Sequence, residues 1–340
     1  MTTSSINSFL AHHRLELSLT PILVGELYLI SKLKHPVYVI RDGLFVTVLA
    51  AGSGPVKEQI NLLLKNGYRD VYIFRDDFEE IRKNLESALI KVNRSLSVGD
   101  PIENGTKNLK LLSLNLGGIY KDPHNDESLM GQFQSSQNLS KFLLENRKTH
   151  SILFQNLSKE NFHFTLSQPM LSSLLLLSFL QSTHLFHERE IENLFLASYL
   201  KDIGFSMIPE EKYDIKNLNG KDQALFANHA DFSFELLEGR IPLAKNYLTI
   251  IRHHHFLNEK MKRLLAKEVT SKNNDSEIIL GLESTLIAVF DILVAMTHDR
   301  PYRKGMTIFQ SMEIIKKLMA DDYPQEFKAL VFFLKQFYKN

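Results

Sequence analysis

The chain has 340 residues, of which 44% are hydrophobic and 23% are charged, and this ordinary globular composition excludes collagen-like, fibrous and disordered proteins. Forty basic and 39 acidic residues leave a net charge of +1, so no global electrostatic field attracts nucleic acid or an anionic membrane. The absence of cysteine excludes a disulfide scaffold, a thiolate nucleophile and any cysteine-based metal site. Any metal must therefore be held by His, Asp or Glu.

The first third of the chain predicts a small α/β domain. Residues 1–35 have a helical pattern. Two β-rich runs, 36–40 and 44–49, flank Arg41-Asp42-Gly43 and predict a hairpin. The apolar spacing predicts a helix over 56–65, a strand over 70–74 and a helix over 78–92. Residues 37–40 either form an open sheet edge that pairs with another chain or lie inside the domain's own sheet.

The remainder of the chain predicts a linker followed by helices. Residues 97–135 are rich in Gly, Asn, Asp, Ser and Pro, which is typical of loops, and the pattern is helical from about residue 139. We therefore expect an N-terminal α/β regulatory or partner-binding domain with its linker over 1–135, and an all-α domain over 136–340. The apolar run 171–180 is too short to span a membrane and predicts a buried helix. With no secretory signal at the N-terminus, these features predict a cytoplasmic protein without a membrane span.

Four short segments of the helical half contain the residue types that metal sites need. They are LKDIG at 200–204, His229, the triplet at 253–255 and THDRPYR at 297–303, with Asp291 eight residues before Asp299. Imidazoles and carboxylates from separate helices can converge on one or two cations in a bundle core. Each residue alone is more typical of a surface or a satisfied core group, and it is their order that favours a metal site.

These segments resemble the HD-GYP family, which comprises bacterial metal-dependent phosphodiesterases that hydrolyse cyclic di-GMP. The resemblance covers roughly residues 160–335. THDRPYR is similar to the family's TSDRPYR, and residues 200–209 are similar to LHDIGKIGIP. His229 matches the histidine of HPEIG, while His254 and His255 match the HHE pair. The resemblance implies an α+β chain of two domains, a small N-terminal α/β domain followed by an all-α helical bundle of the HD type.

The resemblance also implies a set of site residues. The metal ligands are Asp202, His229, His254, His255 and Asp291, and Asp202 is also the catalytic candidate. The ligand-binding residues are Lys201, Arg300, Tyr302 and Arg303. The two arginines can bind phosphate, or they can form structural ion pairs with a carboxylate or a helix C-terminus.

Several positions depart from the family pattern. Lys201 stands where the family has the histidine of its HD pair, and Pro169 stands where it has another histidine ligand. Phe205 replaces a lysine that contacts phosphate, and residues 256–280 contain no GYP loop. One metal position thus keeps Asp202 and the three histidines, while the other keeps mainly Asp202 and Asp291.

Lys201 has two alternative roles. An inward ammonium would repel a cation and pair with Asp202 or Asp291, partly replacing one metal and leaving one divalent ion, such as iron or manganese, or none. An outward side chain would leave a vestigial pocket.

Three functions remain open at this point. The first is a catalytically impaired cyclic di-GMP signalling protein that acts by binding the nucleotide or a protein. The second is an active metal-dependent phosphodiesterase with a reduced metal site, and the third is a structural scaffold. The expected partners are cyclic di-GMP, a protein that binds the N-terminal domain, and a second copy in a homodimer, with no nucleic acid.

Overall fold

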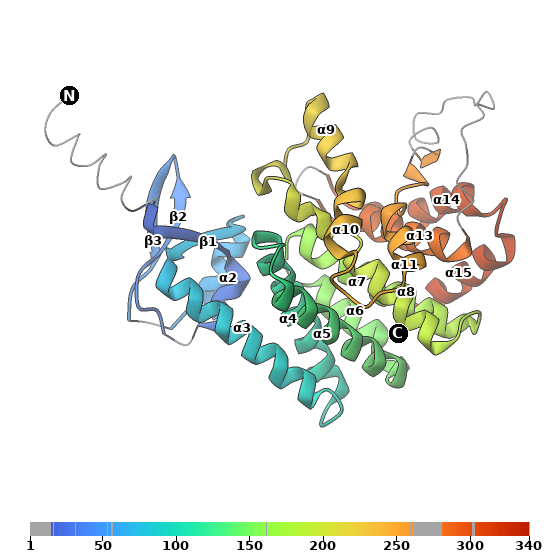
Figure 1. The fold of residues 1–340 in the computed structure, drawn as a ribbon, viewed down its shortest axis with the longest axis horizontal. Coiled ribbons are helices and arrows are strands. Elements are labelled where there is room, and N and C mark those ends of the chain that lie inside the picture. The colour runs from blue at the N-terminus through green and yellow to red at the C-terminus, as the bar shows by residue number, and fades with distance from the viewer. Residues whose placement is uncertain are drawn as a thin grey trace, which may run out of the picture. The chain divides into compact units, whose positions relative to one another are not determined.

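The computed structural model describes residues 15–339 with gaps at 16, 31, 53, 56, 161, 259, 262–280 and 301–302 (Figure 1). The chain divides into two compact units between Val92 and Asn93, and residues 161–163 return to the first unit. The first unit is a small antiparallel sheet with helices, and the second is a helical bundle, so the predicted α+β fold class is confirmed.

The sheet of the first unit has four strands in the order β1 (Leu19–Leu23), β4 (Asp70–Phe74), β2 (Val37–Arg41), β3 (Leu44–Leu49), and all its pairs are antiparallel. The predicted hairpin is confirmed, because β2 and β3 pair across a turn at Asp42 and Gly43. Both turn residues have positive φ, 51° and 76°, as a tight turn between twisted strands requires.

The core of this unit lies between the sheet and its helices, α2 (Lys57–Lys65) and α3 (Arg75–Ser95). Alternate residues of β2 and β4 point into it, because successive side chains of a strand face opposite ways. The fully or almost fully buried side chains include Val37, Val39, Val71, Ile73, Ile60 and Ile81. The predictions of a helix over 56–65, a strand over 70–74 and a helix over 78–92 are therefore confirmed.

The predicted helix over residues 1–35 is confirmed at residues 15, 17 and 18 among the described residues, and it is wrong from residue 19 onward. Residues 19–23 form β1, and Val24–Leu29 forms a 3₁₀ helix, η1. Strand pairing with β4 satisfies the backbone of β1, and no pattern within the segment itself reveals that partner. Because β2 lies between β4 and β3, residues 37–40 lie inside the domain's own sheet, and β1 and β3 are its edge strands.

The predicted linker over residues 97–135 is also wrong, because this region forms α4 (Pro101–Lys121) and begins α5 (Asp126–Glu145). Asp100 caps α4 by accepting from the amide of Ile102 at 2.8 Å, and Asn125 caps α5 by accepting from that of Ser128 at 2.9 Å. The residues that suggested a loop are thus helix caps and buried helix positions. The helical unit accordingly starts near residue 93.

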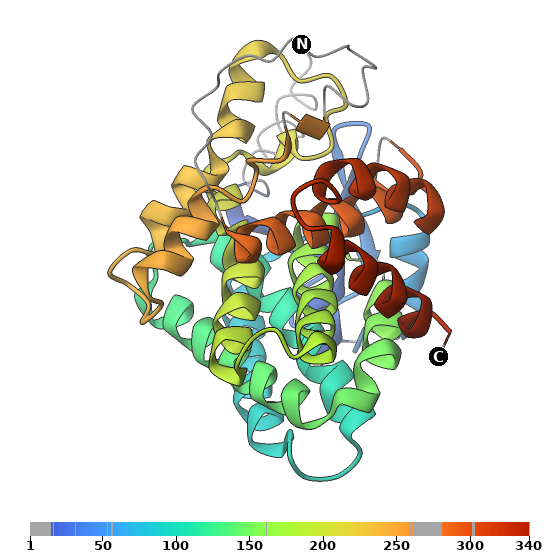
Figure 2. The same ribbon diagram turned by 90° about the vertical axis from the view of Figure 1, so that its right-hand side faces the viewer.

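The prediction of helices from residue 139 onward is confirmed for the described residues. After α5 the chain forms η2 (Arg147–Thr149), α6 (His150–Ser158), α7 (Phe164–Thr183), α8 (Glu188–Leu200), η3 (Ile203–Met207), η4 (Glu210–Lys212), α9 (Gly220–Ala227), α10 (His229–Leu237), α11 (Lys245–Arg252), α13 (Leu282–Thr297), α14 (Ile308–Met319) and α15 (Pro324–Phe337). Helices α7 and α8 pack side by side, and α13 packs against α7 (Figure 2).

Helix α7 is the buried centre of this unit, as the apolar run 171–180 predicted. Among the described residues it alone has the length and composition of a membrane-spanning helix, but 78% of its apolar window is buried in the bundle. Pro169 lies inside this helix and has no amide hydrogen to donate to the carbonyl of Thr165. The hydroxyl of Tyr120, from α4, donates to that carbonyl at 3.0 Å.

Candidate metal centre

The centre is built where α8 ends and the chain turns into η3. Asp202 lies at this turn, and His229 is the first residue of α10. A Cβ atom on Gly204 would lie only 2.1 Å from the carbonyl oxygen of His229, so only glycine permits this close approach of η3 to α10. The amide of Gly204 donates to the hydroxyl of Ser233 at 2.8 Å, which joins the two segments.

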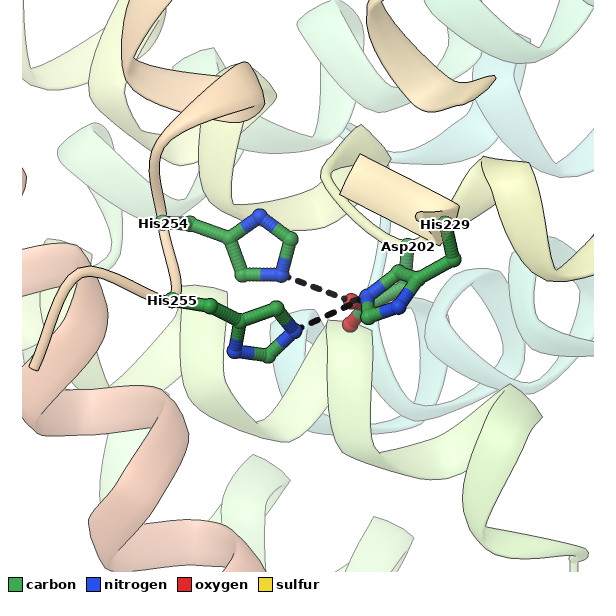
Figure 3. A group of neighbouring side chains, drawn as sticks. All are labelled: Asp202, His229, His254 and His255. Carbon is green, nitrogen blue, oxygen red and sulfur yellow. Dashed lines mark hydrogen bonds and ion pairs between the residues drawn. The ribbon is translucent and has the colours of Figure 1, made fainter. Parts of the chain in front are cut away.

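Three histidines surround the carboxylate of Asp202 (Figure 3). Its Oδ1 lies 3.3 Å from Nε2 of His229 and 3.3 Å from Nε2 of His254. The Nε2 atoms of His229 and His255 are 2.9 Å apart. One ligand atom from each of these four residues lies within 4.8 Å of the others, so they can share a single cation.

The hydrogen bonds of the imidazole rings show that this group fits a metal ion. Nδ1 of His229 donates to the carbonyl of Phe226 at 2.5 Å, and Nδ1 of His254 donates to that of Ile251 at 2.7 Å. When a ring that donates from Nδ1 is neutral, its lone pair lies on Nε2, and in both residues Nε2 faces the carboxylate oxygen of Asp202. Nε2 of His254 is buried and makes no well-aligned hydrogen bond. Nitrogen lone pairs and a carboxylate that face each other in this way repel, and a cation bound between them removes this repulsion.

Burial favours the neutral, metal-binding form of the rings of His254 and His255. It lowers the pKa of His254, although the carboxylate of Asp202 opposes the shift. Burial, together with the neighbouring rings of His254 and His229, holds the pKa of His255 well below its ordinary value. The side-chain amide of Asn258 lies 2.8 Å from Nδ1 of His255, within hydrogen-bonding distance, and restrains that ring.

Lys201 is completely buried and points inward. Its Nζ contacts Oδ2 of Asp202 and lies 2.7 Å from Oδ1 of Asp291, so the ammonium group joins the two carboxylates. Burial by itself lowers the pKa of Lys201, but Asp202 and Asp291 outweigh it and raise that pKa. Burial likewise raises the pKa of Asp202, but the ammonium group of Lys201 lowers it, and that pKa lies well below its usual range. The structure thus contains a charged ion pair and shows the inward alternative for Lys201.

The predicted ligand-binding arginines have different surroundings. The guanidinium of Arg300 lies over the ring of Phe164, 3.9 Å from its centroid, and donates to the side-chain oxygen of Gln168. Arg303 donates to the carbonyls of Ala295 and Met296 at the C-terminus of α13, which is the structural role considered for it. Tyr302 lies outside the described residues.

A cavity of about 230 Å³ adjoins the centre, and Arg300 and Asp291 line it together with Phe205 and Gln168. Phe205 stacks on the imidazole of His229 with a centroid distance of 4.4 Å and an interplanar angle of 11°. Gln168 donates to Oδ1 of Asp291 at 2.7 Å. The motifs gave no signal for Gln168 or Asn258, because both act through side-chain contacts that only the fold creates.

Comparisons with known proteins agree with this architecture. The family model for the HD domain matches residues 154–325, slightly more than half of the chain. A solved structure of an HDG"Y"P protein from Bdellovibrio bacteriovorus is similar, with a TM-score of 0.62 and 17% sequence identity over 93% of this chain and 99% of the other. At that identity the similarity establishes the fold alone. No curated protein matches the chain.

Proposed function

The chain belongs to the HD domain family, and on this basis we propose that it is a cyclic di-GMP signalling protein of the HD-GYP type that binds the nucleotide without efficient turnover. The observation that carries this proposal is the ammonium group of Lys201 between the carboxylates of Asp202 and Asp291. In the HD-GYP family, the aspartate that corresponds to Asp202 bridges two metals. An ammonium group has no lone pair and cannot be a metal ligand, so here it supplies the charge of one missing cation.

One divalent metal fits the remaining residues, which are Asp202, His229, His254 and His255. Imidazole and carboxylate ligands suit iron or manganese. When bound, such an ion supplies positive charge for a phosphate group and lowers the pKa of bound water. Loss of the second cation removes half of the clamp that stabilises charge on a reacting phosphodiester, which is why we expect impaired catalysis.

The chain's own residues provide the remaining recognition. The guanidinium of Arg300 lines the cavity and can bind a phosphate oxygen pair, while Lys201 keeps the neighbouring carboxylates neutralised. Phe205, in place of the family's lysine, gives the cavity an apolar wall against His229. These features favour a binding site over a catalytic one.

A second candidate is an active phosphodiesterase with one metal, and the complete set of Asp202 and three histidines favours it. A scaffold that keeps only the helical fold is the third. A cytoplasmic location, a protein partner for the N-terminal domain and a homodimer are parts of the same proposal.

Metal analysis and calorimetry on the purified full chain, loaded with Mn²⁺ or Fe²⁺, test the proposal. We expect one metal per chain, binding of cyclic di-GMP, and no hydrolysis product that depends on Asp202. Two metals per chain would contradict the role of Lys201, and product formation that Asp202→Ala abolishes would establish the phosphodiesterase. No heat and no thermal shift with the nucleotide would favour the scaffold, because a bound ligand raises apparent stability.

A second variant, Lys201→His, tests whether the ammonium group of Lys201 occupies the position of a cation. It replaces the ammonium with an imidazole that can ligate, and we expect its metal content to exceed that of the wild type. An unchanged metal content in a folded variant would show that Lys201 does not occupy a cation position.

A further inference from the structure

Gln168 connects the buried ion pair to the arginine that lines the cavity. Its Nε2 donates to Oδ1 of Asp291 at 2.7 Å, and its Oε1 accepts from the guanidinium of Arg300. The same Oδ1 of Asp291 lies 2.7 Å from Nζ of Lys201. The four side chains therefore form one continuous chain of contacts, from Lys201 through Asp291 and Gln168 to Arg300.

Hydrogen-bond chemistry fixes the orientation of the side-chain amide of Gln168 in this series of contacts. A guanidinium can only donate hydrogen bonds and an ionised carboxylate can only accept them. The amide oxygen of Gln168 must therefore face Arg300, and its nitrogen must face Asp291. Neither a carboxylate nor an ammonium at position 168 could satisfy both neighbours, whereas an amide satisfies them together.

Phe164 restrains the guanidinium from a second direction. The cation lies 3.9 Å from the centroid of its ring, a distance at which the ring attracts it electrostatically. Phe164 and Gln168 are four residues apart at the start of α7, so both project from the same face of the helix. One helical turn thus supplies both contacts that restrain Arg300.

We propose that Gln168 is a positioning residue that, with Phe164, holds the guanidinium of Arg300 at the cavity to receive a phosphate group of the bound ligand. This inference rests on the proposed function, because it concerns the ligand of the same site. A long arginine side chain loses conformational freedom when it binds, and a restrained one loses less. The guanidinium lines the cavity, and as a cation it attracts an anion that binds there.

A double-mutant cycle on the metal-loaded full chain tests the proposal. Calorimetry with cyclic di-GMP compares the wild type with Gln168→Leu, Arg300→Ala and the double variant at low and high salt. Since a hydrogen bond to a charged group is worth about 1.5–3 kcal/mol, we expect Arg300→Ala to weaken binding by about tenfold to a hundredfold. Gln168→Leu should weaken it by about tenfold, and the double variant should bind like Arg300→Ala.

The salt dependence distinguishes positioning from a general loss of structure. Salt screens the attraction between Arg300 and phosphate, so wild-type binding weakens as salt rises, and Gln168→Leu should show a smaller dependence. The control is Gln181→Leu, the same substitution at the far end of α7. Gln181 donates to the carbonyl of Leu144 and does not line the cavity, so this variant should bind like the wild type.

Two outcomes of the cycle would contradict the positioning role of Gln168. Equal affinity of Gln168→Leu and the wild type, or additive losses in the double variant, would overturn the inference. If Gln168→Leu does not fold, Phe164→Leu replaces it, with about a threefold loss expected that is absent in the Arg300→Ala background.

A different result would show that the proposed function, rather than the positioning role of Gln168, is wrong. In that case the wild type gives no heat with cyclic di-GMP, and the same variants are titrated with inorganic pyrophosphate. A cycle that is non-additive for pyrophosphate supports the positioning role without the nucleotide. No binding of either probe overturns both.

Discussion

Lys201 is an unusual residue because lysine side chains are almost never fully buried unless they are paired. Its ammonium group is charged because two carboxylates outweigh the cost of removing it from water. Removing one partner of a buried pair leaves an uncompensated charge, which costs more than the pair itself contributes. The centre is therefore sensitive to the loss of this single cation.

We predict that Lys201→Met lowers the free energy of unfolding by about 3–5 kcal/mol in metal-free protein, because Asp202 and Asp291 then face each other without a cation. Urea denaturation measures the loss. Added Mn²⁺ should restore part of it, since an ion that binds only the native state stabilises that state.

The control for this prediction is Lys212→Met. Lys212 pairs with Asp222 nearer the surface, where 28% of its side chain is exposed, and a pair of that kind contributes only about 0–1 kcal/mol. Equal losses in the two variants would show that burial of Lys201 carries no special energetic weight.

The sequence motifs predicted the aspartate and histidines of the centre, because spacing and residue type are local properties. They could not predict Gln168, whose two partners lie on or after α13. For Arg303 the sequence left phosphate binding and helix capping open, and only the position of α13 distinguishes them. What the sequence missed at this scale depends on contacts between distant segments.

Among the elements, α4 and α5 show why composition misled the prediction. Asp100-Pro101 and Asn125 are typical of loops and also of helix starts, where an Asp or Asn side chain accepts from the first free amides. Gly105 is buried in α4, and a Cβ there would lie 2.9 Å from a methyl carbon of Leu153 in α6. Small and polar residues here serve capping and close packing.

The contact between η3 and α10 depends on Gly204. A Cβ at this position would lie 2.1 Å from the carbonyl oxygen of His229, and backbone cannot yield as a flexible side chain can. We predict that Gly204→Ala separates Asp202 from His229, destabilises the protein by about 1–3 kcal/mol as overpacking does, and abolishes metal binding. Thermal unfolding and metal analysis measure the two effects.

Gly118→Ala in α4 is the matched control, because nothing lies within 4 Å of its added methyl group. Alanine is the better helix former, so this variant should gain roughly 0.5–1 kcal/mol. Normal metal binding by Gly204→Ala would refute the close-approach argument.

For the whole molecule, the sequence predicted an N-terminal α/β domain and a C-terminal helical domain. It placed the start of the helical domain at residue 136, whereas the helical unit starts near residue 93. The hairpin, α2 and β4 follow from local periodicity and from the Asp-Gly turn. Strand β1 does not, because its pairing partner, β4, follows it only after two other strands, a 3₁₀ helix and an α-helix. Strand formation there is a property of the assembled sheet.

The stability of the molecule should fall in mild acid through His150. Burial lowers the pKa of this residue to about 4, and its Nε2 donates to the carbonyl of Leu143 at 2.7 Å. Between about pH 6.5, where an unfolded histidine titrates, and about pH 4, only the unfolded chain takes up the proton. The free energy of unfolding should therefore decrease by up to about 3 kcal/mol across this window and change no further below it through this residue.

Urea denaturation at a series of pH values, for the wild type and His150→Gln, isolates this contribution. Glutamine keeps a donor for Leu143 but has no proton to gain, so its unfolding free energy should fall less on acidification. Parallel curves for the two proteins would show that His150 remains neutral in both states or charged in both.

The inward position of Lys201 affects how far the charge balance of the centre depends on the supply of metal ions. A bound metal ion must come from the surrounding solution, and a site that needs two ions depends on that supply. The ammonium group of Lys201 is part of the polypeptide and is present as soon as the chain is made. The positive charge between Asp202 and Asp291 therefore does not depend on the supply of iron or manganese.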